Sequence, residues 1–260
     1  MLSEAYSKLA KTDFNPKKVT YNEVYIKVDD IKNVDKICDT LKEEGYQISS
    51  MVDYRKQMQQ QTPYVILADA GDAIQGAPIG TLSEGGYLVD IMNEVGYDFA
   101  TFGNHEFDYK LPQLAKLTKQ AKYQYLACNF KYIGKGTSDL NYKPYEIVTY
   151  GDKKVAFIGI VTPESFTKST PAYFQDESGN YIYSFSEDET GTALYETVQK
   201  TVDEVRAAGA DYVIAMGHLG NEGITDRWTS KAVIANTTGI DAVLDLSLIH
   251  ISEPTRHLRI

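Results

Sequence analysis

Two glycine-containing loops, each directly after an apolar run, constrain this chain more than any other feature. The first loop spans 70–76 and follows the run at 64–68; the second spans 103–108 and follows the run at 99–102. Short runs rich in β-branched and aromatic residues are typical of buried strands. Open α/β sheets place their ligand chemistry beyond the carboxyl ends of such strands. We therefore predict an α/β fold with a site formed by these loops.

The loops carry side chains of metal-ligand type. Asp72 offers a carboxylate, Asn104 an amide oxygen and His105 an imidazole nitrogen, and these groups suit a hard or borderline divalent cation. A later apolar run, at 212–216, ends at Gly217 and His218. Taken singly, such residues are more often turn or exposed loop residues than ligands. The combined pattern favours a metal site.

The amino-acid sequences of both loops resemble those of the metallophosphoesterase superfamily, also called calcineurin-like phosphoesterases. Gly-Asp-Ala-Ile-Gln-Gly at 71–76 and Gly-Asn-His-Glu-Phe-Asp at 103–108 are most similar to the bacterial 5′-nucleotidase branch. The resemblance covers residues 54–245, a partial amino-terminal catalytic domain. It implies a layered αββα sandwich with mixed sheets, truncated at both ends. It also implies metal-dependent hydrolysis of phosphate esters, above all nucleotide 5′-phosphates, by a water that two metals activate.

The resemblance implies roles for individual residues. Asp72 would bridge both metals, and Asn104 and His218 would bind the second metal. His105 would act as a catalytic residue beside the phosphate, oriented by Asp108 three positions on. Glu106 is expected to point away from the site as a structural residue.

The chain departs from the family pattern at both ends of the resemblance. The family opens with a strand that ends in Asp-x-His and later carries Gly-His-x-His, and neither motif occurs here. We therefore expect at most one well-formed metal position, held by Asp72, Asn104 and His218 with water, and impaired hydrolysis. The remaining ligands are compatible with Zn, Mn, Mg or Ca. Loss of the opening strand should expose apolar sheet edge and leave the fold marginally stable.

Both ends of the chain fall outside the resemblance. In the segment 1–53, residues 20–52 predict a β-α-β unit: a strand at 21–28, a helix along 31–41 that Gly45 ends, and a strand at 46–52. This unit weakly resembles an extracytoplasmic domain of an ABC-transporter permease, and we place a junction at 52–54. Residues 246–260 resemble a translated sequencing adapter and are expected to be a non-native tail.

Between the ends, apolar spacing predicts the remaining elements. Amphipathic helices are expected to end at Gly96 and Gly209. The runs 145–150 and 155–161 flank a turn dipeptide and predict a hairpin. Residues 163–187, rich in Ser, Thr, Tyr and Pro, are interpreted as a long functional or mobile loop.

Composition limits the partners. A net charge of −10 disfavours nucleic acid and anionic membranes as partners. The family resemblance implies a small-molecule nucleotide or another phosphate ester as the partner. No apolar run reaches membrane-spanning length. Family members are extracytoplasmic (periplasmic, secreted or at the cell surface), yet residues 1–6 lack the apolar stretch of a signal peptide. Cys38 and Cys128 are expected to be small core residues. The oligomeric state stays open.

Two alternative functions remain open. Related enzymes act as 2′,3′-cyclic-nucleotide phosphodiesterases, and the same metal site would serve that reaction. The other alternative is a non-catalytic chimeric fragment, in which residues 20–52 would be a binding module of a transport system and the rest an incomplete passenger.

Overall fold

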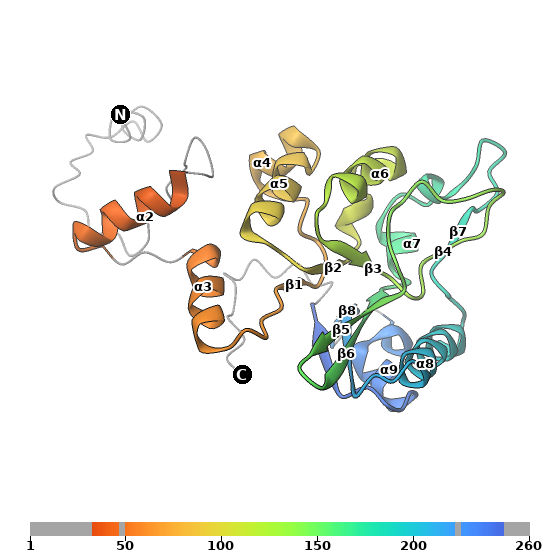
Figure 1. Cartoon of the computed structure of the whole chain (residues 1–260). Helices are drawn as coiled ribbons and strands as arrows, with labels where there is room; N and C mark the ends of the chain where they lie inside the picture. Colours follow the sequence, from red (N-terminus) through yellow and green to blue (C-terminus); the bar gives the residue numbers. More distant parts are fainter. Residues whose placement is uncertain (1–32, 47–49, 222–224, 247–260) are drawn as a thin grey trace. The chain divides into compact units, whose positions relative to one another are not determined.

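The computed structural model describes residues 33–46, 50–221 and 225–246 (Figure 1). The chain divides into two compact units, Met1–Ile48 and Ser49–Ile260, and each is described by itself. The strand expected at 21–28 lies outside the described residues, as does most of the tail expected at 246–260. Of the helices in the described part, none combines the length and apolar character needed to cross a bilayer.

In the first unit, the described element is helix α2 (Val34–Glu43). Cys38 is buried on this helix, and Ile37 and Leu41 are half-buried, as the apolar spacing predicted. Gly45 follows the helix at φ +90°, and its N–H donates to the carbonyl of Lys42 at 3.0 Å. This left-handed position favours glycine. The predicted helix and its end at Gly45 are therefore confirmed.

The second unit begins with helix α3 (Met51–Gln61), where the sequence predicted the end of a strand. The strand predicted at 46–52 is thus wrong at Met51 and Val52. The physical reason is the residue before them, because the Ser50 hydroxyl accepts the Asp53 N–H at 3.1 Å and satisfies a free amide of the first turn. The junction placed at 52–54 falls inside this helix.

Two sheets form the centre of the second unit. The first is parallel, with the strands in the order β1 (Ala68–Asp69), β2 (Phe99–Thr101) and β3 (Gln124–Leu126). The second is mixed, with the order β5 (Tyr145–Tyr150), β6 (Lys153–Val161), β8 (Tyr212–His218) and β9 (Ala242–Asp245). A small buried cluster contains residues from both sheets: Phe99, Leu126, Phe157 and Met216.

Helices cover the outer face of each sheet. Figure 1 shows α4 (Ala77–Ser83), α5 (Gly86–Val95) and α6 (Lys110–Gln120) beside the first sheet, and α8 (Thr192–Ala207) and α9 (Ser230–Ala235) beside the second. Val89 and Leu114 share a core with β2 and β3, whereas Val198 and Val233 share one with β6 and β8. The α/β fold with mixed sheets is therefore confirmed.

Several element boundaries follow the sequence closely. Gly96 caps α5 in the left-handed conformation at φ +85°, and α8 ends at Ala207, two positions before Gly209. Strands β5 and β6 form the predicted antiparallel hairpin. The run predicted as a strand at 64–68 pairs only from Ala68, because the Leu67 N–H instead donates to the Asp98 carboxylate at 2.9 Å.

The segment 163–187 is more ordered than the sequence predicted. It contains α7 (Ser165–Lys168), the 3₁₀ helix η4 (Pro171–Phe174) and β7 (Tyr183–Ser184), which pairs with β4 (Lys131–Tyr132). The prediction of a long loop is therefore wrong. The reason is aromatic packing. Phe174 and Phe185 are fully buried, and their ring centroids lie 5.1 and 5.6 Å from that of Phe107.

Lys110 at the start of α6 has a positive φ of +68°, which costs an L-residue about 1–2 kcal/mol. Glycine costs about 1 kcal/mol at either Lys110 or Lys116 in this helix, but at Lys110 it also removes the cost of the left-handed backbone. We therefore expect Lys110→Gly to be about 1–2 kcal/mol more stable than Lys116→Gly in urea unfolding. Equal stability of the two variants would contradict the left-handed conformation of Lys110.

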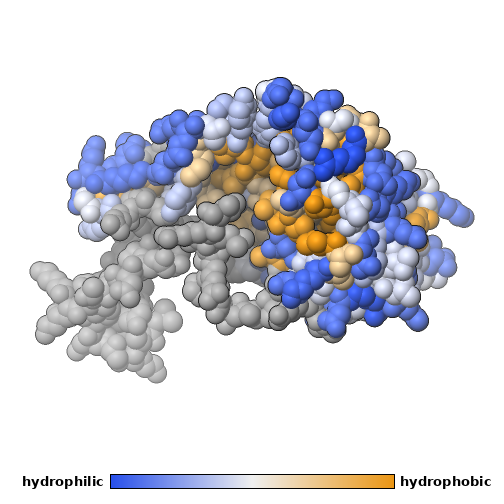
Figure 2. All heavy atoms as spheres, turned by 90° about the horizontal axis from the view of Figure 1, so that it is seen from below, coloured by the Kyte–Doolittle hydropathy of each residue, from blue (hydrophilic) through white to orange (hydrophobic). Residues whose placement is uncertain are grey.

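The sheets of the second unit leave apolar side chains exposed. Strand β1 is an edge of its sheet, and Tyr64, Tyr212 and Leu244 are each more than a third exposed. Figure 2 shows one face of the molecule on which apolar residues gather. Such patches and edges favour association between molecules.

We therefore expect thermal unfolding of the whole chain to be irreversible and to produce aggregates at a rate that rises with protein concentration. Light scattering recorded during a thermal scan at several concentrations would measure this. A sharp and reversible transition above about 65 °C, the upper end for ordinary mesophilic domains, would show that the exposed edge is harmless.

Candidate functional site

The two motif loops touch each other beyond the ends of β1 and β2. A Cβ atom on Gly71 would overlap the backbone of Gly103, and one on Gly103 would overlap Asp72. Gly71 also has φ +97°. The glycines that flank the motifs are therefore required for contact between the loops themselves, and this contact brings Asp72 beside the stretch that carries Asn104 and His105.

Asp72 lies at the centre of this contact. It has φ +65°, a conformation that is uncommon for residues other than glycine and is often found at functional sites. Its Oδ1 accepts the backbone N–H of His105 at 2.9 Å, and its Oδ2 lies 3.1 Å from Nε2 of His218. Burial raises the pKa of Asp72, but pairing with His218 and the hydrogen bond from His105 together outweigh burial, and the net shift is downward.

His218, the last residue of β8, is fully buried. Its Nδ1 lies 2.9 Å from the carbonyl oxygen of Ala70, and since a carbonyl only accepts, Nδ1 carries a hydrogen. Its Nε2 faces the Asp72 carboxylate but makes no aligned hydrogen bond. Burial lowers the pKa of His218, but pairing with Asp72 and the bond to Ala70 together raise it by more, so the net shift is upward.

Asn104 is buried directly before the 3₁₀ helix η3 (His105–Phe107). Its backbone carbonyl accepts the Ser169 hydroxyl at 2.9 Å, which connects the site to the segment after α7. Within the described ranges, no residue forms a hydrogen bond with the Asn104 side-chain amide. A buried amide of this kind is suited to a ligand.

His105 and Asp108 form a half-buried pair. Nδ1 of His105 lies 2.6 Å from Oδ2 of Asp108. This hydrogen bond is the main reason that the pKa of His105 is raised, with burial opposing it and the charge of Asp72 adding to it. The pair thus favours a protonated imidazole held in a fixed orientation.

Glu106, which is buried, and Asp69, which is half-buried, are acids that the sequence interpretation did not place in the site. Glu106 was expected to point away as a structural residue. Its bonds to backbone N–H groups of both motif loops agree with a structural role, but the expected direction is wrong, because the carboxylate turns inward between the loops. Burial raises the pKa of Glu106 to about 7 and that of Asp69 to about 6. The sequence signal that could have placed Glu106 in the site was its position inside the second motif. Asp69 had no such signal, since it is only an acid at the end of a short strand.

Two side chains of metal-ligand type, Asp72 and His218, meet at this site. A carboxylate oxygen and an imidazole nitrogen 3.1 Å apart, with no aligned hydrogen bond between them, would repel each other unless a proton or a metal ion compensates. The buried amide of Asn104 supplies a third donor type, and three protein ligands plus water is common at catalytic zinc sites. Across the described ranges, no three His, Cys, Asp or Glu side chains gather around one point.

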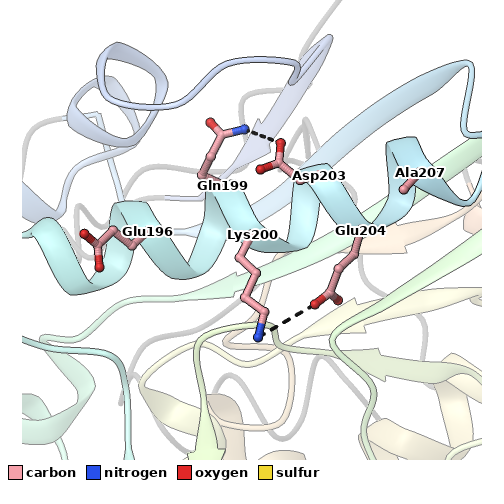
Figure 3. A pocket seen from close by; sticks show the side chains of 6 residues that line it. All are labelled: Glu196, Gln199, Lys200, Asp203, Glu204 and Ala207. Atoms are coloured by element: carbon pink, nitrogen blue, oxygen red, sulfur yellow. Dashed lines mark hydrogen bonds and ion pairs between the residues drawn. The ribbon is translucent and has the colours of Figure 1, made fainter.

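The concavity along α8 is not a competing site. It is lined by Glu196, Gln199, Lys200, Asp203, Glu204 and Ala207 (Figure 3). Gln199 donates to Asp203 at 2.8 Å, and Lys200 lies 3.9 Å from Glu204. These are ordinary contacts between residues four positions apart on an exposed helix face.

Comparisons with known proteins agree with the fold and the loop motifs. The family model described as "Bacterial capsule synthesis protein PGA_cap" matches residues 60–246. The 5′-nucleotidase of Bos taurus is 33% identical over 191 residues, which cover 72% of this chain and 30% of that protein. The Homo sapiens 5′-nucleotidase is 32% identical over 192 residues, which cover 73% of this chain and 30% of that protein. The chain thus spans about a third of the length of these curated relatives.

Solved structures give the same result. The calcineurin-like phosphoesterase YfkN from Bacillus subtilis is similar to this chain with a TM-score of 0.58 and 28% identity. The similarity covers 75% of this chain and 61% of that one.

The glycine contact between the loops predicts opposite effects at two positions. Gly103→Ala pushes a Cβ into Asp72 and should lower the free energy of unfolding by about 2 kcal/mol, as overpacking does. Gly86→Ala places its Cβ in open space at the start of α5 and should raise it by about 0.5 kcal/mol. Urea unfolding of both variants measures the difference; a neutral Gly103→Ala would contradict the contact.

Proposed function

Since this chain belongs to the calcineurin-like phosphoesterase superfamily, in the family described as bacterial capsule synthesis protein PGA_cap, we propose that it is the metal-binding core of a phosphate-ester hydrolase. The observation that supports this most is the pair formed by Asp72 and His218. The pair brings an anionic oxygen and an imidazole nitrogen to 3.1 Å, and His218 is buried and held at its other nitrogen by Ala70. A metal-ligating histidine is usually held in this way.

In this proposal Asp72, Asn104 and His218 hold one divalent cation, with Zn, Mn, Mg and Ca all compatible with the ligand types. When bound, such an ion polarises a phosphoryl oxygen and lowers the pKa of a water ligand. The chain's own contribution is to orient its donors before the ion arrives. Ala70 fixes the tautomer of His218, and the N–H of His105 orients the carboxylate of Asp72.

His105 is proposed as the catalytic acid beside the phosphate. Asp108 holds a hydrogen on Nδ1, so the proton that a charged imidazole can give away is the one on Nε2. That N–H would donate to a phosphoryl oxygen or to the leaving oxygen, where negative charge develops. The upward pKa shift of His105 keeps this proton available at higher pH than for a free histidine.

The substrate is proposed as a nucleotide 5′-phosphate, since the curated relatives are 5′-nucleotidases. Turnover should be weak, because one metal clamps a phosphate less completely than the two-metal site of the superfamily. The extracytoplasmic location implied by the sequence resemblance is part of the same proposal.

Metal binding tests this proposal directly. We expect the wild-type chain to bind about one Mn²⁺ per molecule in calorimetric titration. Asp72→Asn, which tolerates the left-handed backbone, and His218→Ala should each abolish binding. Asp152→Ala, in an exposed turn, is the control and should bind as the wild type does.

Hydrolysis of AMP by the same four proteins completes the test. Weak activity in the wild type and in Asp152→Ala, lost in the other two variants, would support the proposal. Binding of two ions with rapid turnover would refute the single-site assignment, and absence of binding would refute the metal centre and favour a non-catalytic chain.

A further inference from the structure

Glu106 connects the two motif loops through three backbone hydrogen bonds. Its Oε2 accepts the N–H of Asp72 at 2.8 Å and the N–H of Gly103 at 2.6 Å, and its Oε1 accepts the N–H of Ala73 at 2.9 Å. The side chain is 1% exposed. Its charge and hydrogen-bonding capacity are therefore directed at the loop backbones rather than at solvent.

The positions of these donors are informative. Asp72 and Ala73 belong to the first motif, whereas Gly103 directly precedes Asn104 in the second. The glycine contact prevents the loops from moving closer, and the carboxylate prevents them from moving apart. The left-handed conformation of Asp72 is strained, and such conformations persist only when surrounding contacts hold them in place. One of these contacts is the hydrogen bond from the Asp72 N–H to Glu106.

We propose that Glu106 is a positioning residue whose carboxylate sets the distance between Asp72 and Asn104, and with it the affinity of the site for a divalent cation. This inference rests on the proposed function, because it concerns the same site. Glu106 itself touches neither ion nor substrate in this role. It acts on backbone groups, so its effect is carried by loop geometry.

The chain offers a matched control. Glu164 is also buried, at 4% exposed, and its Oε1 accepts a single backbone N–H, that of Thr225, at 2.9 Å. That bond joins segments outside the two motif loops. Glu164→Gln keeps an oxygen for this one donor, whereas Glu106→Gln has only one oxygen for three donors.

The experiment compares Mn²⁺ affinity and amide hydrogen exchange in the wild-type chain, Glu106→Gln and Glu164→Gln. Loss of a group that orients metal ligands typically lowers affinity about 10- to 100-fold. We expect this loss for Glu106→Gln and a change of less than about threefold for Glu164→Gln. The amides of Asp72, Ala73 and Gly103 should also lose protection in Glu106→Gln, while those of β8 keep theirs; a general loss of stability would not produce this local pattern.

The outcomes separate this inference from the proposed function. If the wild type binds Mn²⁺ and Glu106→Gln binds it equally well, the positioning role is wrong and the metal site stands. If the wild type binds no Mn²⁺, both are wrong. Should Glu106→Gln fail to fold, Glu106→Asp replaces it: this variant keeps the carboxylate but is one methylene too short to reach all three donors. Wild-type affinity in Glu106→Asp would overturn the inference, and a tenfold loss would support it.

Discussion

The approach of His218 to Asp72 is the interaction on which the candidate site depends. His218 ends β8 in the mixed sheet, and Asp72 follows β1 in the parallel sheet. One side chain pair therefore joins the two sheets at their carboxyl ends, and the bond from His218 to Ala70 holds the same strand end. A buried pair of this kind is not a strong source of stability, because desolvation offsets the attraction. Packing energy alone therefore does not account for this pair.

Local patterns predicted the elements whose determinants are local. The helices near Gly96 and Gly209 and the hairpin at 145–161 were correct because caps, turn residues and periodicity lie within the segments themselves. The errors came from partners that are distant in sequence. Aromatic contacts with Phe107 order the segment 163–187. The Asp98 carboxylate accepts the Leu67 N–H, which would otherwise have extended β1.

The sequence predicted which residue types form the site, but not the hydrogen bonds that hold the motif loops together. The two loop motifs identified the superfamily correctly, because that resemblance depends on short contiguous stretches. The inward direction of Glu106 could not be predicted in the same way. It depends on which side of a 3₁₀ turn meets the other loop, and this is decided by the contact between Gly71 and Gly103. The proximity of Asp72 and His218 followed only from the family resemblance, since no local periodicity relates residues so far apart.

The 3₁₀ turn η3 has a further consequence for how this stretch can change over evolutionary time. With three residues per turn, neighbouring side chains point in three different directions. Here His105 meets Asp108, Glu106 turns to the loop backbones, and Phe107 enters the aromatic core. Inserting or deleting one residue would rotate each of these side chains into the place of another. A change in length would therefore disrupt all three contacts at once, whereas the exchange of one side chain would disrupt only its own contact.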